Sequence, residues 1–251
     1  MKKLMVIGIG AGNPDYITVQ AVKALNRVDV FFLMDKGQSK DQLIDLRREI
    51  CDRYITDHAH RFVEAHSPER ERGEVDYTSS VEALNLAKQS TFERLINDEL
   101  SDDQCGGFLV WGDPALYDST IRILQAILAS GRCVFEFEVI PGITSVQALA
   151  AQHKVPLNNI GRSIEITTGR RLAAGQVSDA DNLVVMLDAQ DAYQQVADRE
   201  TQIYWGAYLG TPDQLLISGR LEDVADEIER VRKAAREAHG WIMDTYLLRK
   251  P

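Results

Sequence analysis

Cysteine, basic side chains and long apolar runs are all scarce in this chain of 251 residues. Its three cysteines, Cys51, Cys105 and Cys133, are odd in number and widely spaced, which excludes a disulfide framework and a paired-cysteine metal site. We therefore expect reduced, buried thiols. No run reaches the roughly 18 apolar residues that span a bilayer. The first residues lead into a glycine loop, not a cleavage site, so we expect a cytoplasmic protein.

The deficit of positive charge restricts the partners further. The chain has 38 acidic and 28 basic side chains, and its net charge of −10 repels nucleic acid and anionic membrane surfaces. Histidine is also scarce, and three of the five, His58, His60 and His66, lie close together. They lack a matching second pair of ligands, so we expect no metal site.

The residues that are present predict a folded α/β protein. Apolar stretches bounded by glycine and proline alternate with helical patterns, as in βαβ units with a largely parallel sheet. The predicted strands lie at 3–10, 28–35, 106–113, 133–142, 182–188 and 201–210. The pattern over 222–240 predicts a solvated helix with one apolar stripe. We place a domain boundary in the loop "WGDPALYD", which gives an N-terminal domain at 1–113 and a C-terminal domain at 114–251.

Three loops share one design, in which a hydrophobic strand ends in small residues and proline just before a helix. They are "GIGAGNPD", "WGDPALYD" and "IPGITSVQ". Glycine allows close backbone approach, and the first turn of a helix offers unpaired N–H groups to a ligand. The first loop resembles the dinucleotide fingerprint GxGxxG with Asp35 on the ribose, but Asn13 stands where the third glycine belongs. A phosphate-binding role therefore loses support.

The order of the motifs resembles that of a known family. The stretches "VIGIGAGNPDYITVQAVKAL", "WGDPALYDST", "VIPGITSVQALAAQHKVPL", "TTGR" and "WGAYLGTPDQLLISGRL" are similar to successive motifs of the tetrapyrrole methylases, along nearly the entire chain. The sequence departs from the family's "GPGDP" in the first loop, where Ala11 and Asn13 replace proline and aspartate.

The resemblance implies a fold, a cofactor and a partner. It implies two α/β domains with a cleft between them, S-adenosylmethionine as methyl donor, S-adenosylhomocysteine as product, a tetrapyrrole substrate and a homodimer. A sulfonium cofactor needs polar main-chain contacts and an apolar slot, which suits glycine loops. The residues expected to bind the cofactor are Gly10, Ala11, Gly112, Asp113, Leu116, Thr144, Ser145, Met186 and Ala207.

Several of these residues also have a purely structural interpretation. Asp113 precedes a proline and is a good helix N-cap, and Thr144 or Ser145 suits the cap of the next helix. Met186 is apolar enough to fill a gap in the core. The sequence alone leaves these alternatives open, and the resemblance favours binding.

Catalytic and substrate-binding residues are expected at strand ends and in cationic stretches. The candidates for a general base are Asp35, Asp113 and Tyr117, and we favour Asp35 because it ends a strand. The tetrapyrroles that such enzymes methylate are ringed with carboxylates, which cations bind. The candidate cations are Lys36, Arg61, Arg70, Arg72, Arg170 and Arg171. The competing hypotheses are a methyltransferase for another tetrapyrrole and a non-catalytic nucleotide-binding module.

Overall fold

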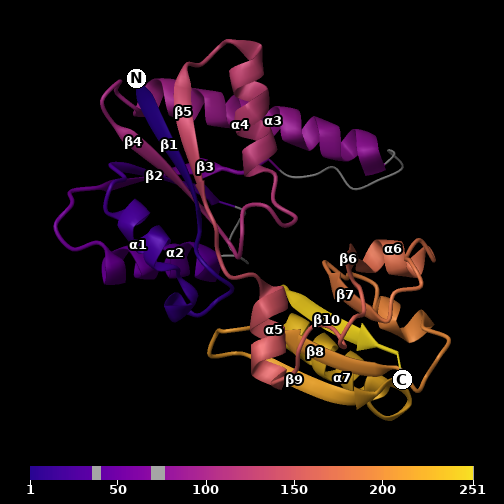
Figure 1. Ribbon diagram of the computed structural model, residues 1–251. Coiled ribbons are helices and arrows are strands. Elements are labelled where there is room, and N and C mark those ends of the chain that lie inside the picture. The colour runs from indigo at the N-terminus through magenta and orange to yellow at the C-terminus, as the bar shows by residue number, and fades with distance from the viewer. Residues whose placement is uncertain (36–40, 69–76, 251) are drawn as a thin grey trace. The chain divides into compact units, whose positions relative to one another are not determined.

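The computed structural model of the chain describes residues 1–35, 41–68 and 77–250. Its contacts divide the chain into two compact units, Met1–Gly10 with Pro14–Ile143 and Ala11–Asn13 with Thr144–Pro251. Each unit is built on its own five-stranded sheet (Figure 1). The α/β class and the two domains expected from the sequence are therefore confirmed.

The first unit contains a parallel sheet in the order β3-β2-β4-β1-β5. Its strands are β1 (Lys2–Gly8), β2 (Val30–Asp35), β3 (Arg61–His66), β4 (Cys105–Val110) and β5 (Phe135–Ile140). Every residue of β4 is buried, as expected for an inner strand covered on both faces. This two-sided burial explains why continuous apolar runs predicted the strands β1, β2 and β4.

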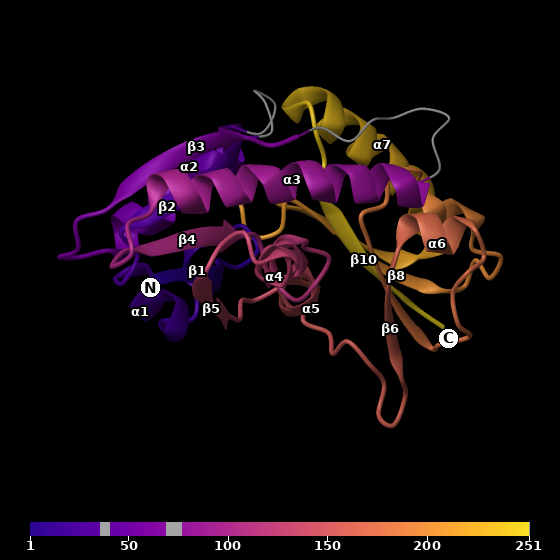
Figure 2. The same cartoon turned by 90° about the horizontal axis from the view of Figure 1, so that it is seen from above.

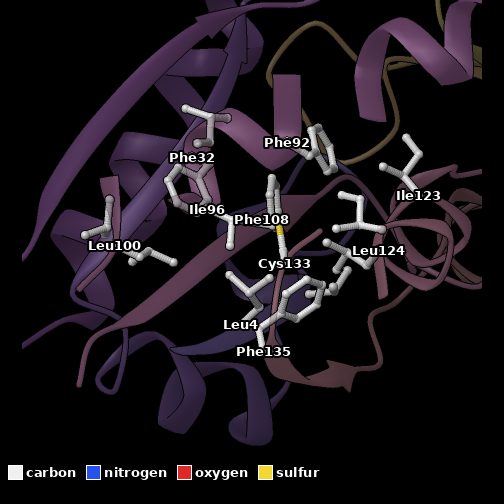
Figure 3. Close-up of a cluster of buried hydrophobic side chains, with 14 of the residues drawn as sticks. Leu4, Phe32, Phe92, Ile96, Leu100, Phe108, Ile123, Leu124, Cys133 and Phe135 are labelled. Atoms are coloured by element: carbon white, nitrogen blue, oxygen red, sulfur yellow. The ribbon is translucent and has the colours of Figure 1, made fainter. Parts of the chain in front are cut away.

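Two pairs of helices cover opposite faces of this sheet. They are α1 (Val19–Leu25) with α2 (Asp41–Tyr54), and α3 (Tyr77–Glu99) with α4 (Thr120–Ser130). Helices α3 and α4 contact each other, as Figure 2 shows. Figure 3 shows the core beneath them, where the ring of Phe92 stacks on Phe108 with 4.4 Å between centroids. The helices that follow β1 and β4 thus lie on opposite faces.

The division between the units falls after Ile143, whereas the sequence placed it after Asp113. Residues 114–143 belong to the first unit because α4 packs on its sheet and β5 pairs in parallel with β1. This ladder runs from the pair Lys2 and Phe135 to the pair Ile7 and Ile140. The loop "WGDPALYD" is therefore an internal connection between a strand and a helix.

The second unit contains a mixed sheet in the order β6-β7-β10-β8-β9. Its strands are β6 (Ile164–Thr168), β7 (Asn182–Met186), β8 (Gln202–Ala207), β9 (Leu215–Arg220) and β10 (Asp244–Arg249). Only β6 and β7 are parallel, and the remaining pairs are antiparallel. The expectation of a largely parallel arrangement is therefore wrong for this unit.

Helices α7 and α5 pack on the second sheet, as does the short helix α6 (Gly169–Ala173). Helix α7 (Leu221–His239) buries Leu221, Ala225 and Ile228 against β8 and β10, which confirms the predicted solvated helix with an apolar stripe. Helix α5 (Ser145–His153) contacts β8, β9 and β10. Its first residues lie beside the start of β10, where the candidate site of this unit is found.

The three cysteines are buried and free, as predicted. Burial, together with the neighbouring Asp52, raises the pKa of the Cys51 thiol to about 12. Burial and Asp29 raise the pKa of Cys105 to about 11. A thiol with so high a pKa carries almost no thiolate at neutral pH, so these cysteines are core residues without nucleophilic character. In the part of the chain that is described, no helix is long and apolar enough to cross a membrane.

Candidate active site

Three glycine loops meet at the carboxyl edge of the first sheet, after β1, β4 and β5. The amide of Gly10 donates to the Gly112 carbonyl at 3.3 Å, and the amide of Gly112 donates back to the Gly10 carbonyl at 2.8 Å. A Cβ on Gly142 would lie 2.0 Å from the Gly112 oxygen. The glycines of these loops therefore allow three backbones to touch, at the edge where open parallel sheets place their ligands.

Asp113 ties two of these loops together. Its Oδ1 accepts from the Ala115 amide at 2.7 Å, and its Oδ2 accepts from the Gly142 amide at 2.8 Å. Asp113 does not cap α4, which begins at Thr120, where Asp118 accepts from the backbone amide at 2.7 Å. Because both oxygens of Asp113 accept hydrogen bonds from backbone amides, the carboxylate is suited to positioning the loops.

Leu116 and Tyr117, in the same loop, are partly exposed. Leu116 is half-buried, and its amide donates to the Asp113 carbonyl at 3.2 Å. Tyr117 is 45% exposed and adopts a positive φ of 52°. A positive φ is uncommon for a bulky residue and concentrates at functional sites. This conformation turns the loop sharply just before α4.

Four of the predicted cofactor residues lie close together in the second unit. Ser145 Oγ and Thr245 Oγ1 are 2.9 Å apart and share a hydrogen bond. Thr245 pairs with Met186 on one side of β10 and with Gly206 on the other. Ala207, the next residue of β8, is fully buried beside Asp244. The start of α5 and the carboxyl ends of β7 and β8 therefore converge around the first residues of β10.

Thr144 is the N-cap of α5. Its hydroxyl accepts from the Val146 amide at 3.1 Å, and its own amide donates to Gln147 Oε1 at 3.1 Å. This reciprocal arrangement is a capping box. The capping interpretation of Thr144 is therefore confirmed, and its cofactor role stays a prediction.

The first loop divides between the two units after Gly10. Ala11 is buried, and Gly12 has a φ of +93° with its Cα close to the loop after β8. A Cβ on Gly12 would lie 2.2 Å from the Leu209 oxygen. The segment 11–13 therefore packs against the β8 loop, as part of the same unit as Ala207.

A buried charge network that the sequence did not predict supports the start of β10. Arg232 of α7 is 4% exposed, and its Nε donates to Asp244 Oδ2 at 2.8 Å. The same oxygen accepts from Trp205 Nε1 at 3.0 Å, and Arg232 Nη1 lies 3.0 Å from Asp191 Oδ1. Arg232 stands at a position of α7 that belongs to the apolar stripe facing the core. This position is the sequence signal that could have predicted the burial of its side chain.

Asp188 extends this network beyond the end of β7. Its Oδ2 accepts from the Tyr246 hydroxyl and from the Ala192 amide, both at 2.7 Å. Burial, with Asp188 close by, raises the pKa of Tyr246 well above its ordinary value. The phenol therefore stays protonated and donates. The hydrogen bonds of Asp188 and Asp244 therefore hold the strand ends that carry Met186 and Thr245 in place.

The predicted substrate cations are dispersed. Arg61 lies at the amino end of β3, away from the glycine loops, and its Nη1 is 2.9 Å from Glu99. Arg170 and Arg171 are exposed on the short helix α6 (Gly169–Ala173) of the second unit. Lys36, Arg70 and Arg72 lie outside the described residues, as does the side chain of Asp35, the last residue of β2. Within the first unit, the one predicted cation that the structure describes, Arg61, therefore does not lie at the carboxyl edge of the sheet.

Two of the three clustered histidines, His58 and His60, have protein partners. His58 Nε2 is 3.1 Å from Asp29 Oδ1, and His60 Nδ1 is 3.1 Å from the His58 carbonyl oxygen. Within the described ranges, no group of three potential ligands is placed to hold a metal ion.

The fold and the glycine loops define a two-domain α/β protein with a candidate ligand site, lined by backbone, at the carboxyl edge of its parallel sheet. The family model for Tetrapyrrole (Corrin/Porphyrin) Methylases matches residues 3–225. The chain therefore belongs to the tetrapyrrole methylase family. The methyltransferase class predicted from the sequence is confirmed, and a non-catalytic nucleotide-binding module is excluded.

Three individual proteins are similar to this chain over nearly its whole length. The chain is 51% identical to a precorrin-6A synthase (deacetylating) of Sinorhizobium sp., over 100% of this chain and 96% of that protein. A cobalamin synthesis related protein of Corynebacterium diphtheriae superposes with a TM-score of 0.83 and 36% identity, covering 99% of this chain and 98% of the other. A uroporphyrin-III C-methyltransferase of Thermus thermophilus, solved with S-adenosylhomocysteine, shares the fold at a TM-score of 0.58 and 17% identity, covering 99% and 97%.

Proposed function

We propose that the chain is a precorrin-6A synthase (deacetylating) of cobalamin biosynthesis. It transfers a methyl group from S-adenosylmethionine to C-1 of precorrin-5 and releases the two-carbon acyl group as acetate. The 51% identity to a synthase of this name over the whole chain carries the proposal. A C-methyltransferase for another precorrin or for uroporphyrinogen is the alternative, since relatives 22–27% identical bear such names.

The residues around the strand ends suit a sulfonium cofactor. Thr168 pairs with Met186 at the end of β6, and the buried hydroxyls of Thr167 and Thr168 have no hydrogen-bond partner among the described residues. Buried polar groups are normally satisfied, so these hydroxyls suit a ligand with polar groups. We propose that the cofactor is bound by Gly10, Ala11, Gly112, Asp113, Leu116, Thr144, Ser145, Met186 and Ala207.

Orientation accounts for the methyl transfer in this proposal. The bound cofactor supplies an electrophilic methyl group on a sulfonium. Because the accepting ring carbon is electron rich, the chain has to align the two reactants, which supplies on the order of 7–11 kcal/mol in favourable cases. The fixed backbone of the glycine loops and the supported strand ends suit this task.

Release of acetate requires an added water molecule. A general base takes a proton from the water, whose oxygen bonds to the acyl carbonyl carbon. When the bond between the acyl group and the ring breaks, its electron pair stays with the ring carbon, which takes the proton back from the base or bonds to the transferred methyl group. The acyl carbon leaves with the water oxygen as acetate. We propose Asp35 as this base, because it ends β2 at the carboxyl edge of the sheet. Asp113 is less suited, since its oxygens accept two backbone hydrogen bonds.

Asp35→Asn is expected to lower the rate of acetate release by about 10²- to 10⁴-fold, the usual contribution of a general base. Binding of S-adenosylhomocysteine, measured by calorimetry, is expected to stay at the wild-type level. The control is Asp98→Asn, which alters an exposed carboxylate near the end of α3. Unchanged methylation and unchanged acetate release in Asp35→Asn would rule out this assignment.

The substrate is tested by separate incubations with precorrin-5 and with uroporphyrinogen III, each with methyl-labelled S-adenosylmethionine. The proposal predicts label in the tetrapyrrole from precorrin-5 alone. Label in uroporphyrinogen, with none in precorrin-5, would establish the alternative.

We also propose, from the family resemblance, that the enzyme is a cytoplasmic homodimer. Sedimentation would show the dimer as twice the mass of one chain.

A further inference from the structure

Arg47 of α2 contacts β4 just beyond the point where its pairing with β2 ends. The ladder between β2 and β4 ends at the pair Phe32 and Phe108. The carbonyl of the next β4 residue, Leu109, accepts from Arg47 Nε at 3.0 Å instead of from β2. Arg47 Nη1 donates to the Leu43 carbonyl at 2.6 Å. The guanidinium is thus held by backbone oxygens at the carboxyl edge of the sheet.

The charge of Arg47 is only weakly compensated. Burial lowers the pKa of its guanidinium to about 10, and Asp118 opposes this shift from a distance. The side chain therefore stays charged at neutral pH. No ion pair joins Arg47 to a carboxylate within the ranges that the structure describes. Arg47 is half-buried, and a partly desolvated cation without a direct counter-ion is costly, so a ligand anion at this place would gain the attraction with little further desolvation of Arg47.

Lys88 of α3 is a second cation of the same kind. Its Nζ donates to Ser119 Oγ at 3.4 Å, in the loop after β4. Burial lowers the pKa of Lys88, and the charge of Asp118 again opposes the shift. The Oδ1 of Asp118 already accepts from the Thr120 amide at 2.7 Å. Both cations therefore contact the segment from Leu109 to Ser119, which carries Gly112 and Asp113, and neither forms an ion pair among the described side chains.

We propose that Arg47 and Lys88 bind a peripheral carboxylate of the tetrapyrrole at the carboxyl edge of the first sheet. The inference rests on the proposed function, since it takes the substrate to be a polycarboxylate. In a chain with a net charge of −10, a local excess of cations is needed to hold such an anion. Arginine and lysine bonds to carboxylates are charge-assisted and stronger than neutral hydrogen bonds. Arg61, by contrast, is paired with Glu99 at the amino end of β3.

A purely structural role for the two side chains predicts different results from a binding role. If Arg47 only links α2 to β4, its replacement lowers stability and leaves the KM for the tetrapyrrole unchanged. If it binds a carboxylate, the KM for the tetrapyrrole depends on the charge. Arg47→Met keeps most of the apolar stem and removes the charge, whereas Arg47→Lys keeps the charge. Lys88→Met is a second test. It removes one long hydrogen bond, to Ser119, so its effect on folding is expected to be small.

The experiment measures methyl transfer with precorrin-5 as the varied substrate, and S-adenosylhomocysteine binding by calorimetry. We expect Lys88→Met and Arg47→Met each to raise the KM for the tetrapyrrole about tenfold, with a smaller increase for Arg47→Lys. The affinity for S-adenosylhomocysteine is expected to stay within about twofold of wild type. The matched control is Arg132→Met, since Arg132 is exposed and pairs with Glu93.

A wild-type KM for the tetrapyrrole in Lys88→Met would overturn the inference, as would an equal loss of affinity for tetrapyrrole and S-adenosylhomocysteine. Lys88→Met decides the matter if Arg47→Met does not fold. Failure of the wild-type enzyme to methylate precorrin-5 is a different result. It would contradict the proposed function, and with it the substrate on which this inference rests.

Discussion

Gly142→Ala is expected to lower kcat/KM for methyl transfer by at least about 10²-fold, the cost of a misplacement of about 1 Å in an active site. The new Cβ would lie 2.0 Å from the Gly112 oxygen and 2.9 Å from the Gly8 Cα. These are backbone atoms, which have no alternative rotamer, so the loops after β1, β4 and β5 have to separate. The hydrogen bond from the Gly142 amide to Asp113 is disturbed at the same time.

The measurement is kcat/KM for methyl transfer, together with calorimetry of S-adenosylhomocysteine and a circular dichroism spectrum to verify folding. The matched control is Gly131→Ala. Gly131 ends α4 with a φ of +68°, and no atom lies within 4 Å of a Cβ built there. Its replacement is expected to cost about 1 kcal/mol of stability and to leave kcat/KM unchanged. A folded Gly142→Ala enzyme with wild-type kcat/KM would show that contact between the loops is not required.

Arg232→Met is expected to lower the free energy of unfolding by about 3–5 kcal/mol. Arg232 is 4% exposed and Asp244 is 6% exposed, and their ion pair measures 2.8 Å. Removing the guanidinium leaves the Asp244 carboxylate buried without its cation, and Asp191 loses the same partner at 3.0 Å. The loss of stability therefore comes from the unpaired charges that remain.

Denaturant unfolding of wild type and variant gives the change in free energy. Arg236→Met is the control, because Arg236 is exposed on the same helix, and it is expected to change the value by less than about 0.5 kcal/mol. Adding Asp244→Asn to Arg232→Met is expected to recover part of the loss, since the uncompensated charge is then absent. If the two arginine variants lost equal stability, the buried network would have no special role.

The first unit was largely predictable because its strands are buried on both faces. The continuous runs at 3–10, 28–35 and 106–113 correspond to β1, β2 and β4. In the second unit, β9 alternates between half-buried and exposed residues, and β6 has only one neighbouring strand. Neither strand gives a continuous apolar run, so both were missed. The strand β10 was missed as well, because its apolar run is only Tyr246–Leu248. The position of the domain boundary depends on the pairing of β5 with β1, which local sequence does not reveal.

The candidate site was predictable where its chemistry depends on local sequence. The glycine loops and the cap at Thr144 follow from the order of residues around strand and helix ends. Arg47 and Arg232 were missed because the burial of an arginine depends on segments far away in the chain, here Leu109 and Asp244. From the sequence alone, an arginine side chain is expected to be exposed to solvent. The cations chosen from charge-rich stretches were dispersed for the same reason.

One incubation tests the coupling of methyl transfer to acetate release. Purified enzyme is given precorrin-5 and S-adenosylmethionine, and S-adenosylhomocysteine and acetate are measured in the same samples over time. Both products are expected to accumulate in equal amounts. Formation of S-adenosylhomocysteine and a methylated tetrapyrrole without acetate would contradict this coupling.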